Sequence, residues 1–338
     1  MSHENLLSCL LAERPWLLAD GATGTSLFNM GLEAGDAPEL WNVDQPEKIN
    51  ALYKGWLDAG SDIFLTNTFG GNGARLKLHG AQDRVLDLNT AGAAIGRDMV
   101  DASDRQVVVA GSMGPTGEIM EPMGALTYDT AVDLFHEQAE GLKAGGADVA
   151  WIETISDPQE FKAAAEGCRR ADLPWCGTMS FDTAGRTMMG FTSEQLAALI
   201  AELPSPPVAY GANCGVGASD LLRTVLGFSP AIAPIPVIAK GNAGIPKYVD
   251  GHIHYDGTPE LMAHYACLAR DAGARIIGGC CGTTPRHIEE MRTALETRPA
   301  GNLPSHDEIT AQLGAFSSEN DGTGATDTGG RTRRRRRR

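Results

Sequence analysis

Seven cysteines occur in this chain of 338 residues, and three of them have a spacing that suits metal chemistry. Cys280 and Cys281 are adjacent and lie between glycines, and Cys214 stands in the segment Gly-Ala-Asn-Cys-Gly at 211–215. Thiolates are soft ligands that favour zinc over magnesium or calcium, and three of them with a vacant fourth position are typical of a catalytic zinc site. The three cysteines are therefore predicted to hold a zinc ion and to form the reactive centre.

Ordinary buried cysteines are the alternative interpretation, because a free cysteine packs like a small apolar residue. That interpretation is kept for the four cysteines that stand alone in helix or strand patterns, Cys9, Cys168, Cys176 and Cys267. The buried-cysteine interpretation suits the other three poorly, since apolar packing gives no reason for two adjacent cysteines between glycines. A disulfide between adjacent cysteines would be strained, and a reducing compartment disfavours it.

The elements that must position these cysteines are short apolar strands alternating with amphipathic helices. Strands are expected at 16–19, 62–66, 107–111, 149–153, 175–180, 208–212, 236–239 and 276–279. Helices are expected at 46–59, 84–100, 128–144, 158–171, 193–201, 219–227, 259–272 and 285–295. Eight such units predict one α/β domain, a parallel (β/α)8 TIM barrel. An open doubly wound sheet is the alternative, but the glycines at 20–24 lack the spacing of its phosphate-binding fingerprint.

The domain limits follow from where this alternation fails. The barrel is predicted to occupy residues 1–297, and residues 298–338 are expected to form a low-complexity, disordered tail that ends in an arginine run. We expect that run to be solvated, with nonspecific binding to nucleic acid or to an acidic partner as the alternative.

The charge and the first residues limit the class of protein. Of the formal net charge of −15, the arginines at 331 and 333–338 contribute +7, so the rest of the chain carries −22. An acidic body argues against a specific nucleic-acid-binding surface. The first residues show no basic start followed by a long apolar run, which predicts neither a signal peptide nor a membrane anchor. A cytoplasmic protein with reduced cysteines is expected.

Working residues of a TIM barrel lie where its strands end, and polar side chains are predicted at these positions here. Cys214 and the pair Cys280 and Cys281 end the sixth and eighth strands, which only the seventh separates, so the three should converge. Neighbouring strand residues point to opposite faces, so the pair can face one metal only where the strand has become a turn. The glycines at 278, 279 and 282 permit that turn.

Six segments of the sequence resemble the homocysteine-binding domain family of methyltransferases. They are Asp-Gly-Ala-Thr-Gly-Thr at 20–25, Thr-Asn-Thr-Phe at 66–69, Gly-Pro-Thr-Gly at 114–117, the cysteine segment at 211–215, Gly-Asn-Ala-Gly-Ile-Pro at 241–246 and Gly-Gly-Cys-Cys-Gly-Thr-Thr-Pro at 278–285. The similarity extends from about Leu17 to Leu295. It implies a zinc-containing barrel that transfers a methyl group to homocysteine and forms methionine.

The resemblance also implies which residues bind the amino acid. Acidic Asp20 and Glu153 are expected to bind the ammonium group of homocysteine. Backbone amides near Gly21 and in the 114–117 turn, which contains Thr116, are expected to receive its carboxylate as small anion-binding nests. Asn67, at the end of the second strand, is a further candidate for substrate contact.

Asn242 follows the seventh strand, between the two cysteine-bearing strands. Family members of the methionine synthase kind fill the vacant zinc position from this region, whereas betaine enzymes use a tyrosine where this chain has Thr154. Asn242 is therefore predicted as the resting fourth ligand or its near neighbour, with loop capping as the alternative.

The methyl donor is the least constrained part of the function. A betaine donor needs an aromatic cage for its trimethylammonium group, and apart from Trp41 the expected walls look depleted. Segments at 65–70 and 178–182 resemble the methionine synthase branch. The implied protein is a stand-alone homocysteine half of a split cobalamin-dependent methionine synthase, which receives its methyl group from a corrinoid protein in trans. A betaine or methylsulfonium donor is the alternative, and a non-catalytic zinc- or thiol-binding module is the alternative from another class.

Overall fold

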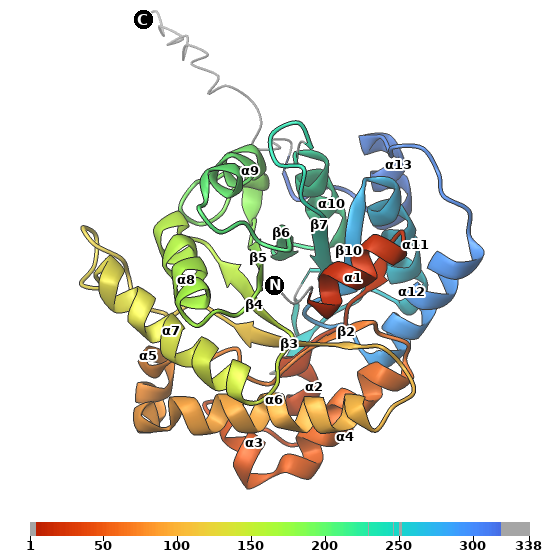
Figure 1. Cartoon of the computed structure of the whole chain (residues 1–338). Helices are drawn as coiled ribbons and strands as arrows, with labels where there is room; N and C mark the ends of the chain where they lie inside the picture. The colour runs from red at the N-terminus through yellow and green to blue at the C-terminus, as the bar shows by residue number, and fades with distance from the viewer. Residues whose placement is uncertain (1–4, 229, 246, 250–251, 319–338) are drawn as a thin grey trace, which may run out of the picture.

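Eight parallel strands form a nearly closed barrel inside a ring of helices in the computed structural model (Figure 1). The structure describes residues 5–228, 230–245, 247–249 and 252–318. The barrel strands are β1 (Leu17–Leu18), β2 (Ile63–Leu65), β3 (Val108–Met113), β4 (Val149–Ile155), β5 (Trp175–Met179), β6 (Ala209–Cys214), β7 (Val237–Gly241) and β10 (Ala274–Gly279). Each overlaps one predicted strand, so the predicted TIM barrel is confirmed.

All eight predicted helices are present around the strands. They are α4 (Pro46–Asp58), α6 (Val85–Asp101), α7 (Tyr128–Ala144), α8 (Pro158–Arg170), α9 (Ser193–Glu202), α10 (Ala218–Leu226), α11 (Pro259–Asp271) and α12 (Pro285–Thr297). Four of them, α4, α8, α11 and α12, begin with a proline, whose missing N–H would have no helical partner at that position. Among the helices of the described residues, none has the length and apolar content needed to span a membrane.

Several shorter elements were not predicted. They are α1 (Leu6–Glu13), α2 (Thr23–Asn29), α3 (Trp41–Asp44), α5 (Gly73–Leu76), α13 (His306–Leu313), the 3-10 helices η1 (Pro38–Leu40), η2 (Lys77–His79), η3 (Gln82–Arg84) and η4 (Thr183–Gly185), and the antiparallel hairpin of β8 (Lys247–Val249) and β9 (His252–His254). Most of them lie in loops after strands, where periodicity gives little signal.

The strands pair in the order β1, β10, β7, β6, β5, β4, β3 and β2. Between β1 and β2 the backbone forms only one isolated bridge. Two aspartate side chains complete this seam. The carboxylate of Asp62 accepts a hydrogen bond from the backbone N–H of Leu18 at 2.9 Å, and the carboxylate of Asp20 accepts one from Leu65 at 2.7 Å. Closure of the barrel therefore depends on two buried acids.

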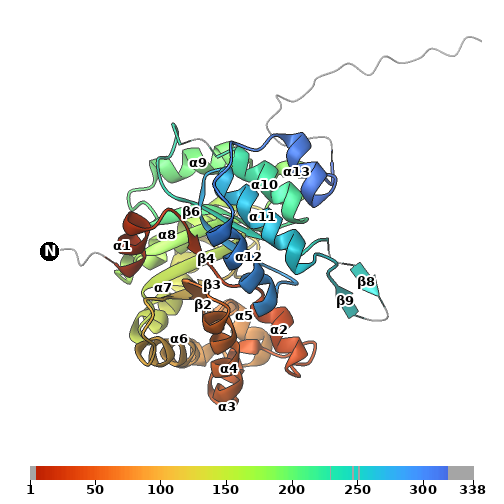
Figure 2. The same ribbon diagram turned by 90° about the vertical axis from the view of Figure 1, so that its right-hand side faces the viewer.

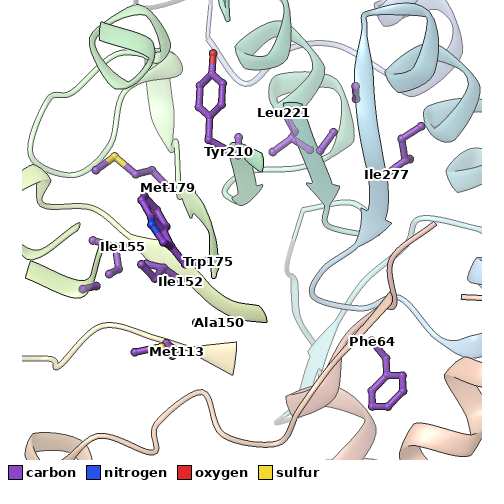
Figure 3. Close-up of a cluster of buried hydrophobic side chains, with 14 of the residues drawn as sticks. Phe64, Met113, Ala150, Ile152, Ile155, Trp175, Met179, Tyr210, Leu221 and Ile277 are labelled. Atoms are coloured by element: carbon purple, nitrogen blue, oxygen red, sulfur yellow. The ribbon is translucent and has the colours of Figure 1, made fainter. Parts of the chain in front are cut away.

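Alternate residues of each strand form two apolar layers, because successive side chains point to opposite faces. Ala150 and Ile152 of β4 belong to the outer layer between strands and helices, part of which Figure 3 shows. Val149 and Trp151 belong to the inner layer that fills the barrel. Three leucines of α1 join the inner layer and close one end of the barrel. The β8–β9 hairpin projects from the opposite end (Figure 2).

The C-terminal segment differs from the prediction, because part of the tail that was expected to be disordered forms helix α13. Within residues 298–338, helix α13 buries Ile309 and Leu313 against the main core. Beyond it, Ser317 donates hydrogen bonds from its backbone and hydroxyl to Asp220 of α10. Two buried residues in one short helix give too weak a periodicity to be recognised in a polar sequence. The predicted arginine run lies outside the described residues.

Truncating the chain before Ser305 should lower the free energy of unfolding by about 2 to 4 kcal/mol, because the buried side chains of Ile309 and Leu313 are lost. Urea unfolding followed by circular dichroism measures the change. Deleting only residues 329–338 is the control and should leave the midpoint unchanged, since this polar sequence offers little apolar surface to bury. Equal midpoints for both truncations would contradict the packing of α13.

Candidate functional site

A cavity of about 320 Å³ opens among the loops that follow the strands. The spacing of inward-facing residues creates its polar floor. Glu153 lies two residues beyond Trp151 on β4, and Lys240 lies two residues beyond Ile238 on β7. The lining includes Gly21, Asn67, Phe69, Ser112, Glu153, Cys214, Lys240, Cys280 and Cys281. The apolar filling of the barrel therefore gives way to charged groups and thiols at this end.

The three predicted cysteines converge at one side of this cavity. Strand β7 separates the two strands that carry them, as predicted. Their sulfur atoms all lie within 4.8 Å of one another, and the Sγ atoms of Cys214 and Cys281 are 3.9 Å apart. A tetrahedral zinc with zinc–sulfur bonds of about 2.3 Å needs ligand sulfurs about 3.8 Å apart. The arrangement therefore fits a zinc ion with three protein ligands.

Local backbone geometry brings the adjacent cysteines to the same side. Gly282 has a φ of 79°, which favours glycine, and it turns the chain directly after Cys281. A Cβ atom on Gly279 would lie 2.3 Å from the Thr283 hydroxyl, so this glycine serves close packing rather than the turn. Cys214 itself has a φ of 61°, which is unusual for a residue with a side chain. Strained backbone of this kind is concentrated at functional sites.

Burial and mutual hydrogen bonding raise the pKa of these thiols. The hydrogen bond with Cys214 is the main cause that raises the pKa of Cys280, and burial adds to it. For Cys214, the hydrogen bond with Cys280 lowers the pKa, but the hydrogen bond with Cys281 and burial outweigh it and raise the pKa to about 12. A bound cation is what would convert such a cluster to thiolates.

A buried ion pair lies beneath the cavity. The Nζ atom of Lys240 is 2.5 Å from an Asp20 oxygen, and the two side chains are 2% and 0% exposed. Glu153 stands near this pair and accepts a hydrogen bond from the Ser112 hydroxyl at 2.6 Å. The Nδ2 atom of Asn213 is 3.4 Å from the second Glu153 oxygen, which is a long hydrogen bond. Asp20 therefore has a full ionic partner, whereas Glu153 has neutral ones.

The electrostatics of these three groups favour an incoming cation. Burial raises the pKa of both Asp20 and Glu153, and the ammonium of Lys240 opposes that rise. Burial acts to lower the pKa of Lys240, but the attraction of both carboxylates outweighs it and the pKa is raised. In their ionised forms the three groups sum to −1. A ligand ammonium group beside Glu153 would neutralise this charge.

Several predicted substrate contacts are placed differently by the structure. Asp20 does not line the cavity, because Lys240 and the seam occupy its carboxylate. Thr116 does not line it either, since its hydroxyl and its backbone N–H both donate to Glu160, at 2.6 and 2.8 Å. The backbone N–H of Thr116, which was predicted to bind the substrate carboxylate, is therefore already hydrogen-bonded to Glu160. Gly21 lines the cavity as expected.

The two predicted asparagines line or border the site, but their amides are engaged with the protein. Asn67 lines the cavity, while its Nδ2 donates to the Pro38 carbonyl at 2.7 Å. The Oδ1 of Asn242 accepts from the backbone N–H of Cys281 at 3.0 Å. Its Nδ2 lies 3.7 Å from the Cys214 sulfur, so the structure places Asn242 as a near neighbour of the sulfur cluster, which is one of the two predicted positions.

Lys240 is the charged residue of the buried ion pair that the sequence did not predict, and Glu39, Phe69 and Ser112 of the cavity lining were not predicted either. Lys240 is the one charged residue in the apolar strand Val-Ile-Ala-Lys-Gly at 237–241. A lysine is rarely fully buried unless it is paired. An isolated charge in a core strand indicates a buried ion pair. Its partner, Asp20, is 220 residues away in the sequence, so the spacing could not identify it.

Comparison with known proteins gives a consistent family. Residues 17–295 match the family described as homocysteine S-methyltransferase. Methionine synthase of Mycobacterium tuberculosis (strain ATCC 25618 / H37Rv) is 34% identical over 82% of this chain and 24% of its own length. Methionine synthase of Mycobacterium leprae (strain TN) is 33% identical over 87% of this chain and 25% of its own length. The chain thus spans about a quarter of the length of these relatives.

Solved structures agree with this match. The homocysteine methyltransferase MmuM from Escherichia coli, in its oxidized form, has a TM-score of 0.69 and 26% identity and covers 86% of this chain and 99% of its own. Its metallated form has the same TM-score with 25% identity over the same shares. The similarity therefore extends over almost the whole of that protein.

Replacing Lys240 with methionine should destabilise the fold by about 3 to 5 kcal/mol, because Asp20 would remain as an uncompensated buried charge at the seam. Urea unfolding at neutral pH measures the loss. The double variant Asp20→Asn with Lys240→Met should recover part of it, since the amide oxygen introduced by Asp20→Asn can still accept from the backbone N–H of Leu65. A single variant as stable as the parent would show that the ion pair does not support the barrel.

Proposed function

The chain belongs to the homocysteine S-methyltransferase family, and we propose that its cavity holds a zinc ion beside homocysteine and methylates the homocysteine sulfur to form methionine. One observation supports this proposal above the others. Three thiols that fit a tetrahedral zinc line the same cavity as Glu153, whose hydrogen-bond partners among the described residues are neutral. Homocysteine carries the two complementary groups, a thiol and an ammonium.

The metal end of the cavity belongs to Cys214, Cys280 and Cys281. Their spacing and their soft sulfur donors suit zinc, and the related Escherichia coli enzyme exists in a metallated form. When bound, zinc would lower the pKa of a substrate thiol and keep its sulfur as a nucleophilic thiolate. Three protein ligands would leave a fourth position for that sulfur.

The amino acid end belongs to Glu153, with Gly21 on the wall of the same cavity. Ser112 orients Glu153 by donating to one carboxylate oxygen, and the other oxygen, which has only a long 3.4 Å contact with Asn213, can accept from a substrate ammonium. Holding both ends of homocysteine fixes the direction in which its sulfur faces the donor. In the transfer, a sulfur lone pair forms the new bond to carbon. The old bond of the methyl group breaks, and its electron pair stays with the donor.

For the methyl donor we propose a corrinoid carried by another protein. The methionine synthase relatives are about three and a half times as long as this chain, which is consistent with donor functions outside the matched region. A trimethylammonium donor would find few aromatic faces. Of the described residues that line the cavity, only Phe69 is a phenylalanine, tyrosine or tryptophan. Trp41 lies outside the lining and already has the Lys48 ammonium 4.1 Å from its ring centroid.

A small cationic donor is the second candidate, and Glu39 is the observation that favours it. This carboxylate is buried, lines the cavity and accepts from the backbone N–H of Gly70 at 2.6 Å. Burial disfavours its ionised form and raises its pKa, an effect that nearby Arg75 opposes, so an added cationic group such as a methylsulfonium or betaine would stabilise the carboxylate.

Replacing Cys280 with serine should remove most of the bound zinc and abolish methyl transfer, because a neutral hydroxyl cannot replace a thiolate ligand. Metal analysis of the purified variant and a methionine-formation assay measure both effects. The fold should survive, since other contacts hold the core together. The matched control is Cys9→Ser on α1, which should keep metal and activity. Full activity in metal-free Cys280→Ser protein would end the zinc hypothesis.

Changing Glu153 to glutamine should weaken homocysteine binding by about 1 to 3 kcal/mol without releasing zinc, since an amide cannot balance the ammonium charge. Calorimetric titration of zinc-loaded protein gives the affinity. Glu160→Gln changes another buried carboxylate that lies outside the cavity lining, so its affinity should match the parent. Unchanged affinity in Glu153→Gln would reduce this residue to a structural role.

With zinc and homocysteine supplied, methylcobalamin should support faster methionine formation than betaine or S-methylmethionine. The reason is that the cavity offers one aromatic wall, and each missing wall costs about 0.5 to 2 kcal/mol of cation recognition. Initial rates measured in parallel decide between the donors. A much faster rate with betaine or S-methylmethionine would replace the corrinoid proposal by the cationic donor and leave the homocysteine chemistry intact.

A further inference from the structure

A closed circuit of hydrogen bonds surrounds the turn that carries the two adjacent cysteines. The carbonyl of Cys281 accepts from the backbone N–H of Ala243 at 2.9 Å, and the carbonyl of Ala243 accepts from the N–H of Gly257 at 2.8 Å. The carbonyl of Gly257 is 2.9 Å from Nε2 of His287. The circuit closes where Nδ1 of His287 accepts from the backbone N–H of Thr284 at 3.1 Å. His287 supplies the one side chain in this circuit.

These bonds fix which ring nitrogen of His287 carries the proton. A carbonyl oxygen can only accept a hydrogen bond, so Nε2 must donate to Gly257. A backbone N–H can only donate, so Nδ1 must accept from Thr284. The imidazole is therefore neutral with its proton on Nε2, and it is buried. A rigid ring in one tautomer holds two backbone segments at a fixed separation.

The circuit joins segments that are remote in the sequence. Ala243 belongs to the loop after β7, Gly257 to the segment that leads from the β8–β9 hairpin to α11, and His287 to the first turn of α12. Close packing supports the middle link, because a Cβ atom on Gly257 would lie 2.5 Å from the carbonyl carbon of Ala243. The base of the hairpin is thereby anchored to the cysteine turn.

Strand β7 connects this circuit to the third cysteine. Gly241, at the end of β7, pairs with Cys214 of β6. The carbonyl of Gly241 also accepts from the backbone N–H of Cys280 at 2.7 Å. A contact that holds the turn of Cys280 and Cys281 against the loop after β7 therefore also fixes its distance from Cys214.

We propose that His287 is a positioning residue of the metal centre, which holds the turn of Cys280 and Cys281 so that the three sulfurs are preorganised for zinc. The inference rests on the proposed zinc site. Preorganised ligands bind more tightly, because they lose less conformational freedom on binding. Residues that orient metal ligands without contacting the metal typically contribute about 10- to 100-fold in metal affinity.

Helix capping is the alternative role, because His287 stands in the first turn of α12. Its Nδ1 accepts from the N–H of Thr284, which is the N-cap residue of this helix. Such a bond stabilises the start of a helix wherever the helix lies. Capping needs only Nδ1, whereas the circuit also needs Nε2. The two roles can therefore be separated by a side chain that replaces one nitrogen and not the other.

His287→Asn makes this separation. The oxygen of an asparagine side chain can take the place of Nδ1, but the side chain is too short to put a donor where Nε2 contacts Gly257. We expect the zinc affinity, measured by competition with a chromophoric chelator, to fall about 10- to 100-fold. If His287 served only as a cap, the affinity would stay at the parent value.

Gln195→Ala is the matched control for loss of stability. On α9, the side-chain oxygen of Gln195 accepts from the backbone N–H of the N-cap residue Thr192 at 2.9 Å, and neither residue lines the cavity. Loss of this cap should lower the midpoint of urea unfolding and leave the zinc affinity unchanged. If general destabilisation released zinc, this variant would lose affinity as well.

Hydrogen exchange in the unaltered protein tests the circuit without any substitution. The backbone amides of Ala243, Gly257 and Thr284 should exchange slowly in zinc-free protein and gain little protection when zinc is added. Mass spectrometry of the peptides that contain them gives this readout. Protection that appears only after zinc is bound would mean that zinc orders the turn, and that result would overturn the inference.

The parent zinc affinity in a folded His287→Asn variant would also overturn the inference, and it would leave the proposed zinc site intact. A parent protein that binds no zinc through its cysteines would instead remove the proposed function, and the inference would fail with it. The parent titration therefore separates the two failures.

Discussion

Closure of the barrel at the seam between β1 and β2 is the constraint on which the other features depend. Strand β1 is too short to pair fully, so Asp62 and Asp20 supply acceptors where backbone carbonyls would otherwise stand. Each buried acid then needs a cation. Arg14 and Arg292 approach Asp62, both at 2.9 Å, and Lys240 approaches Asp20. The second of these pairs lies beneath the cavity, so the solution to a folding problem sets the electrostatics of the proposed site.

That coupling explains why two acids near one cavity have different roles. Lys240 is shared in the electrostatic sense, since both Asp20 and Glu153 attract it, but it forms its close contact with Asp20. Glu153 is left with Ser112 and a distant Asn213 as neutral partners. A buried carboxylate in this state gains most from an added cation. The seam therefore prepares Glu153 for an ammonium group without contacting the substrate.

The sequence was sufficient for features that depend on spacing along one chain segment. The alternation of strands and helices identified the barrel, and the adjacent Cys280 and Cys281 identified the sulfur cluster with Cys214. Spacing could not show which side chains neighbour one another after folding. Asp20 and Thr116 stand at the predicted strand ends, yet partners remote in sequence, Lys240 and Glu160, occupy them. Helix α13 was not predicted for another reason. Its two buried residues stand in a polar segment, so the apolar periodicity is too weak to recognise.

In the proposed reaction, the two ends of the cavity contribute in different ways. Substrate and product share their ammonium and carboxylate groups, so Glu153 binds both alike and by itself adds affinity without lowering the barrier. Homocysteine and methionine differ only at sulfur, and a neutral thioether is a poorer ligand than a thiolate. Discrimination and release therefore depend on the cysteine end of the cavity. Recognition of the amino acid and control of reactivity can thus vary independently, although the same closed barrel fixes the distance between them.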